Sequence, residues 1–100
     1  MDDWPPPEAR VRSAVWQAEG HLERGEYFAA SRALTEALSF AAPADRPLLL
    51  GLRHLAAAGY RYEGGDRLRA RRQLAHARRR LAGFPDTAAL IELVAAEIES

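Results

Sequence analysis

The 100-residue sequence contains no cysteine and no lysine, and it has no long hydrophobic run. Without cysteine, the chain has no disulfide bond, no thiolate metal ligand and no cysteine nucleophile. No apolar stretch reaches the roughly 18 residues that a membrane-spanning helix requires, so we expect no membrane partner. The opening residues MDDWPPP are acidic and proline-rich, unlike a signal peptide. These features predict a soluble, cytoplasmic protein.

The charges cancel overall but are distributed unevenly along the chain. Fourteen arginines balance 14 acidic residues, which gives a formal net charge of zero. Residues 61–81 carry eight arginines against two acids, a net charge of +6, whereas residues 82–100 carry four acids and no base, a net charge of −4. Segments of opposite sign attract each other or meet an outside partner. An alanine-rich composition in which every base is arginine is also typical of a G+C-rich genome.

Apolar residues recur at intervals of three and four in five segments, the pattern of amphipathic helices. We predict helices over 8–24, 26–41, 47–63, 67–82 and 87–99. The glycine links after the first and third helices are so short that each must join antiparallel neighbours. No segment alternates with the period of two that a strand requires. The fold class is therefore all-α: a compact bundle of about five helices, formed by two tight helical hairpins and a C-terminal helix.

The predicted organisation is a proline-rich leader over residues 1–7 and a single helical domain over residues 8–100. The third helix is apolar on most faces, which indicates a central position. The core is expected to include Leu34, Leu52, Leu55 and Leu74. Aspartates that precede the last three helices are predicted to be their N-caps, at Asp45, Asp66 and Asp86.

The sequence repeats itself with a shift of 40 residues. Gly25-Glu26 falls on Gly65-Asp66, and six further positions coincide within the flanking helices. Each unit reads as helix, glycine turn, helix, which is typical of helical-hairpin arrays. Two units are fewer than the three that an extended solenoid requires, so they favour a closed bundle.

Three stretches together resemble a known family. They are GEYFAAS from Gly25, GLRHLAAAGYRYEGGD from Gly51, and the run RLRARRQLAHARRRL that follows it. Over residues 15–84 the chain resembles the bacterial and archaeal family called domain of unknown function 309, which implies a small all-helical bundle. The family carries an H-x-x-x-E-x-x-W/Y motif with metal-ligand residue types, and its positions are occupied here by Ser31, Thr35 and Leu38. The resemblance therefore implies a degenerate relative without that metal site.

Four polar residues are candidates for a chemical site: Ser31, Glu36, His54 and Arg61. Serine, histidine and a carboxylate are the residue types of a catalytic triad. No G-x-S-x-G turn or glycine-rich nest accompanies them, so we interpret them as a buried polar cluster that satisfies its own hydrogen bonds. The three histidines, at 21, 54 and 76, show no paired spacing that would suit a metal ion. We expect no enzyme activity, no metal and no cofactor.

The arginine-rich helix is the strongest candidate for a binding surface. Five of its side chains could form an anion-binding or partner-binding face: Arg67, Arg71, Arg72, Arg78 and Arg79. No aromatic residue is interleaved with them, which argues against stacking on single-stranded bases, and the pI near 6.8 is low for a nucleic-acid-binding domain. We predict a solvated face partly neutralised by the last helix, with Glu92 and Glu99 close to Arg71 or Arg78.

Two tryptophans, Trp4 and Trp16, do not fit the inward-facing stripes. Exposed aromatic residues concentrate at interfaces, so we predict a symmetric homodimer with one of them near the contact. The sequence thus favours a non-enzymatic interaction or scaffold domain that binds a protein partner or a second copy of itself. The alternatives are a nucleic-acid-binding protein that uses residues 67–80, and a degenerate relative of a metal-binding family.

Overall fold

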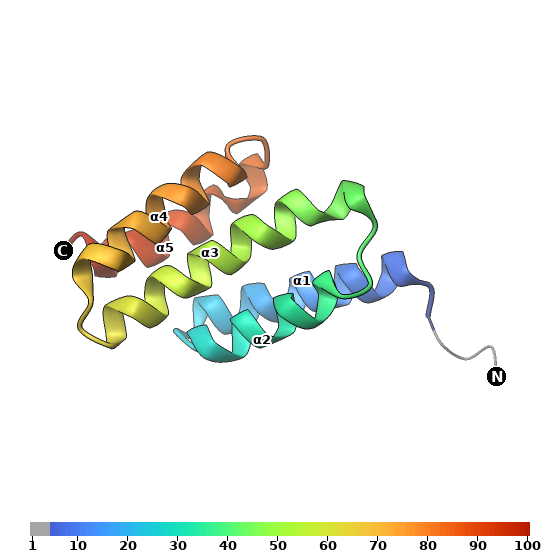
Figure 1. The fold of residues 1–100 in the computed structure, drawn as a ribbon, viewed down its shortest axis with the longest axis horizontal. Coiled ribbons are helices and arrows are strands. Elements are labelled where there is room, and N and C mark those ends of the chain that lie inside the picture. The colour runs from blue at the N-terminus through green and yellow to red at the C-terminus, as the bar shows by residue number, and fades with distance from the viewer. Residues whose placement is uncertain (1–4) are drawn as a thin grey trace.

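The computed structural model describes residues 5–100, and Figure 1 shows them folded into five α-helices. The helices are α1 (Pro7–Glu23), α2 (Tyr27–Leu38), α3 (Arg46–Glu63), α4 (Arg67–Leu81) and α5 (Ala88–Ile98). Short 3-10 turns, η1 (Pro43–Asp45) and η2 (Pro85–Thr87), precede α3 and α5, and the described residues contain no strand. The predicted all-α bundle of two hairpins and a C-terminal helix is confirmed.

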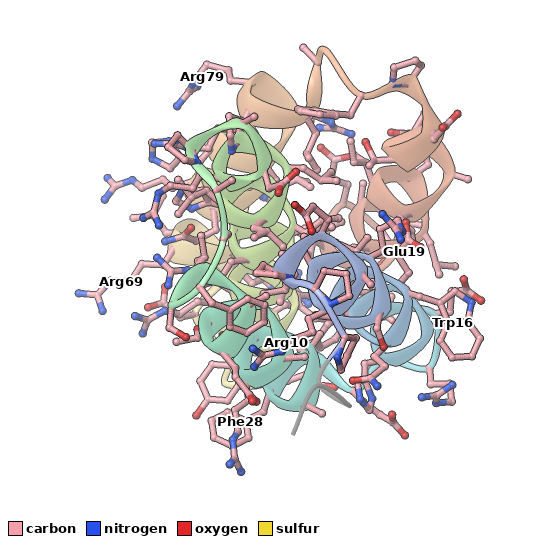
Figure 2. All side chains as sticks on the ribbon, turned by 90° about the vertical axis from the view of Figure 1, so that its right-hand side faces the viewer. Arg10, Trp16, Glu19, Phe28, Arg69 and Arg79 are labelled. Carbon is pink, nitrogen blue, oxygen red and sulfur yellow. The ribbon has the colours of Figure 1, made fainter. Side chains whose placement is uncertain are left out.

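The third helix lies at the centre of the bundle, as its apolar circumference predicted. It packs against α2 on one side and α4 on the other, and it also contacts α5 (Figure 1). Helix α1 packs against α2 and α5. The arrangement places α1 and α5 over the same side of the layer formed by α2, α3 and α4 (Figure 2). The four leucines predicted for the core are all buried: Leu34, Leu52, Leu55 and Leu74.

The two hairpin turns have the same backbone structure, so the 40-residue repeat in the sequence is also present in the fold. Gly25 and Gly65 have φ angles of 74° and 85°, in the left-handed region that glycine adopts without a steric penalty. In both turns the glycine amide donates to the carbonyl three residues earlier, and the next amide donates to the carbonyl five residues earlier. This is the Schellman motif, which ends a helix and lets the chain reverse at once.

The predicted helix caps have three different outcomes. The Asp66 carboxylate accepts a hydrogen bond of 3.1 Å from the amide three residues later, so this cap is confirmed. Asp45 occupies the N-cap position of α3 but its side chain makes no capping bond. The prediction for Asp86 is wrong, because a proline-initiated 3-10 turn delays the start of α5 and leaves Thr87 at its N-cap. The Thr87 hydroxyl donates to the carbonyl of Phe84 at 2.7 Å.

The start of α1 differs from the sequence prediction by one residue. Pro7 belongs to the helix, as its N1 or N2 residue, instead of ending the leader. Proline is tolerated there because the first amides of a helix have no intrahelical acceptor. Of the predicted leader, residues 1–4 with Trp4 lie outside the described part of the chain.

A buried tyrosine joins three helices. The ring of Tyr27 in α2 lies against Gly59 of α3, where even a Cβ atom would collide with it. Its hydroxyl donates a hydrogen bond of 3.0 Å to Glu97 beside the C-terminus of α5. Burial raises the pKa of the Tyr27 phenol, and the hydrogen bond to Glu97 raises it further. The contact therefore depends on a protonated phenol.

Replacing Leu55 with alanine should test the central position of α3. Leu55 is fully buried, so Leu55→Ala should lower the free energy of unfolding by about 2–5 kcal/mol through lost burial and a new cavity. Denaturant unfolding followed by circular dichroism would measure this change. The control is Leu93→Ala on the exposed side of α5, expected to change stability by no more than about 0.5 kcal/mol. Equal effects of the two substitutions would contradict a core built around α3.

The Tyr27 contact predicts a loss of stability at alkaline pH. The phenol of the unfolded chain ionises near pH 10, whereas the folded pKa is higher, so the stabilisation is complete below pH 10 and is lost as the pH rises above it. Tyr27→Phe should cost about 1 kcal/mol at pH 7 and should flatten this alkaline decline. Unfolding curves between pH 8 and pH 11 would measure both effects, with Tyr60→Phe as an exposed control. If the stability of Tyr27→Phe still falls with rising pH as in the unsubstituted chain, groups other than Tyr27 cause the alkaline loss.

Candidate functional site

Helix α4 concentrates positive charge on the side of the molecule opposite to Trp16. It carries seven arginines and no acid, and its buried face consists of small and aliphatic residues. In Figure 2, Arg69 and Arg79 project from one side of the body, whereas Trp16 and Glu19 project from the opposite side. The arginines are therefore displayed around the exposed part of the α4 circumference.

One arginine of the predicted face is neutralised by α5. The Arg78 guanidinium pairs with Glu92 at 3.2 Å and with Glu99 at 3.3 Å. Hydrogen bonds from these two carboxylates raise the pKa of Arg78. The predicted approach of the last helix is thus confirmed for Arg78. Arg71 makes no ion pair with any described residue.

The remaining arginines divide between two sides of α4. The Arg67 guanidinium lies 5.6 Å from the centre of the Tyr62 ring, a cation–π contact at the helix start. Of the five arginines predicted to form a face, Arg78 is paired with α5 and Arg67 lies over Tyr62, and the binding face itself stays a prediction. Arg72 and Arg79 lie seven positions apart and share the outward side of the helix.

We define the outer arginine surface as four exposed residues of α4: Arg69, Arg72, His76 and Arg79. They recur at intervals of three and four and so lie along one side of the helix. Arg69 pairs with Asp66 at 3.5 Å, whereas Arg72 and Arg79 have no carboxylate partner among residues 5–100. Leu68 lies on the same stripe with 63% of its surface exposed. The surface thus combines unpaired positive charge with an exposed aliphatic group.

A pair of stacked histidines borders the outer arginine surface. The rings of His54 in α3 and His76 lie 5.2 Å apart at an angle of 29°. His54 Nδ1 is hydrogen-bonded to Gln73 at 2.7 Å, and Arg79 donates to His76 Nδ1 at 2.8 Å. Desolvation lowers the pKa of His76, and the charge of Arg79 and the neighbouring His54 lower it further. The spacing of the histidines in the sequence gives no sign of this pair, because it forms between two helices.

The structure does not bring the four polar candidates together. Ser31 and Glu36 line a shallow groove on α2, whereas His54 turns toward α4. No hydrogen bond or ion pair between described residues joins any two of Ser31, Glu36, His54 and Arg61, and none of the four is buried. The interpretation as a buried polar cluster is therefore corrected. The buried face of α2 is formed by Tyr27 and small or aliphatic residues instead.

The positions of the family motif lie on α2 and its end. Ser31 and Thr35 line the shallow groove, and Leu38 packs against the core. His21 is hydrogen-bonded to Glu26 at 2.7 Å, at the first hairpin turn. Within residues 5–100, no three histidine, aspartate or glutamate side chains are placed to hold one metal ion.

Among residues 5–100, three aromatic side chains are exposed, all outside α4. Trp16, Phe28 and Tyr60 expose 76%, 61% and 53% of their surface, and the rings of Phe28 and Tyr60 lie 6.1 Å apart. From the sequence we predict Trp4 or Trp16 near an interface, but the sequence does not identify Phe28 and Tyr60 as a pair. Phe28 falls outside the inward stripe of its helix, and this position indicates an exposed ring. Its contact with Tyr60 depends on how α2 packs against α3.

No family model, curated protein or solved structure matches this chain. The resemblance to the domain of unknown function 309 therefore stays a prediction that rests on glycine, aromatic and alanine positions. None of the described helices is long and apolar enough to cross a membrane.

The contact between Arg79 and His76 predicts a change in histidine titration. Arg79→Gln removes a positive charge next to the imidazole, so the pKa of His76 should rise toward its ordinary value. An NMR titration of the histidine ring protons would measure the shift. The matched control is Arg78→Gln, which removes a charge on the α5 side and should leave the pKa of His76 unchanged. Equal shifts in both variants would contradict the specific contact.

Proposed function

We propose that this chain is a non-enzymatic interaction domain and that the outer arginine surface binds an acidic protein partner. The proposal rests on a difference among the arginines of α4, because only some of them have a carboxylate partner within the described part of the chain. The carboxylates of α5 pair with Arg78, whereas Arg72 and Arg79 point outward without a carboxylate partner among the described residues. An acidic partner would supply the missing counter-charges.

The exposed apolar side chain beside these arginines favours a protein as the binding partner over a nucleic acid. Leu68 shares the stripe of Arg72 and Arg79 and is largely exposed. An amphipathic acidic segment would cover Leu68 and pair with the arginines, and arginine is enriched at the centre of protein interfaces. Phosphates would leave Leu68 uncovered.

Nucleic-acid binding is the second candidate, and the spacing of the cationic residues favours it. Arginines at intervals of three and four along one helix can contact successive phosphates. The exposed ring pair of Phe28 and Tyr60 also provides an aromatic surface, which the sequence analysis did not foresee. These observations make duplex and single-stranded DNA necessary arms of the test.

Three single substitutions distinguish the two candidates. Arg72→Gln should weaken the binding of an acidic leucine-containing peptide and of DNA, because both use its charge. Leu68→Ala should weaken the binding of the peptide alone. Arg78→Gln is the matched control and should change neither, since Glu92 and Glu99 already neutralise Arg78. Fluorescence anisotropy with labelled peptide and labelled DNA would measure the affinities.

Salt dependence supplies the decisive comparison. We expect DNA binding to be weak and lost by about 150 mM salt, with peptide binding retained in part through Leu68. Micromolar or tighter binding of duplex DNA at that salt, abolished by Arg72→Glu with Arg79→Glu, would overturn the proposal and favour the nucleic-acid candidate. If neither Arg72→Gln nor Leu68→Ala changes the affinity for the peptide, the binding surface lies elsewhere.

A further inference from the structure

On the outward face of α1, a large exposed apolar side chain lies next to a surface hollow. Trp16 exposes 76% of its surface, the largest fraction among the large apolar side chains of the described residues. One turn later, Gly20 has no side chain. An open hollow of about 440 Å³ is lined by Trp16, Glu19, Gly20, Glu23 and Arg24, among others. Figure 2 shows Trp16 pointing away from the body, on the side opposite to Arg69 and Arg79 of α4.

The fold itself does not explain the glycine at position 20. A Cβ atom there would meet only the flexible guanidinium of Arg24, at 3.3 Å or more. By contrast, a Cβ at Gly51 or Gly59 would collide with the side chain of a neighbouring helix. Glycine is a poor residue for a helix interior, so alanine would be favoured at position 20 if nothing else approached it. Close approach by another molecule explains the glycine and the exposed Trp16 together.

We propose that a second copy of this chain covers the face, so that Trp16 of each copy occupies the hollow over Gly20 of the other. A two-fold axis near position 18 relates the two α1 helices, which run antiparallel. Positions 16 and 20 then lie at the same height, because each is two residues from the axis. The self-complementary contact closes on itself, as symmetric dimers do. Trp16 would also lie beside the Arg24 guanidinium of the second copy, which favours a cation–π contact.

The charges of α1 suit this antiparallel arrangement. Arg12 lies six residues before the axis and Glu23 lies five residues after it, on the same side of the helix as Trp16. Neither makes an ion pair with a described residue of its own chain. In the dimer, Arg12 of each copy faces Glu23 of the other. A parallel arrangement would instead bring like charges together.

Glu19 opposes the dimer and offers an independent test of its geometry. Burial raises the pKa of Glu19, and the nearby Glu23 and Asp86 raise it further. Antiparallel pairing brings the Glu19 side chains of the two copies close together on one flank of the helix pair, where their negative charges repel. Glu19→Gln should therefore tighten the dimer.

The first measurement is the mass in solution by light scattering and sedimentation, from about 1 µM to 1 mM full-length chain. We expect a concentration-dependent rise from 11.1 kDa to twice that mass. Trp16→Ala should raise the dissociation constant at least about tenfold, as expected for a central tryptophan anchor. Phe28→Ala is the matched control, since it removes another exposed aromatic ring and should leave the mass unchanged. A monomer throughout, or a dimer that survives Trp16→Ala, would overturn the proposal.

Two further variants test the hollow and the register. Gly20→Ala should raise the midpoint of thermal unfolding of the dilute monomer, because alanine favours helix, yet weaken the dimer by filling the hollow. Arg12→Glu and Glu23→Arg should each weaken the dimer, and the double variant should restore it. An unchanged dissociation constant in Gly20→Ala, or no restoration by the double variant, would refute this geometry. The outer arginine surface lies on the opposite side, so these tests do not depend on the proposed partner binding.

Discussion

Close approach between α3 and its neighbours is the constraint on which the rest of the structure depends. Gly59 gives the ring of Tyr27 the space it occupies, and Gly51 does the same for Leu81 of α4. These contacts hold α2 and α4 on opposite sides of the central helix, and the hydrogen bond from Tyr27 to Glu97 ties α5 to the same point. Because the inner side of α4 is used in this packing, its arginines are left with the outer side.

Most features that depend on local sequence could be predicted, whereas most contacts between helices could not. The apolar stripes, the two glycine turns and the cap at Asp66 each follow from a few neighbouring residues, and the structure has them as expected. The stacking of His54 on His76 depends on the register between helices. Helical periodicity alone places residues on a face but does not say what lies opposite. For the same reason, helical periodicity does not predict the contact between the rings of Phe28 and Tyr60.

The proposed dimer and the proposed partner surface reinforce each other. Trp16 and Glu19 project from the side opposite to Arg69 and Arg79 (Figure 2). A dimer formed through α1 therefore displays two outer arginine surfaces that face away from each other. Each of the two surfaces would then bind a separate acidic partner. Such a dimer would act as a scaffold that bridges two partners.

The twin hairpin turns also have a consequence for how the chain folds. The helix pairs with the most extensive contacts, α1 with α2, α2 with α3, and α3 with α4, are all neighbours in sequence. A topology with mainly local contacts has a low contact order, and such proteins fold rapidly. Each hairpin can form around its own glycine turn without waiting for the rest. The bond between Tyr27 and Glu97 spans 70 residues, so we expect α5 to dock after the hairpins have formed.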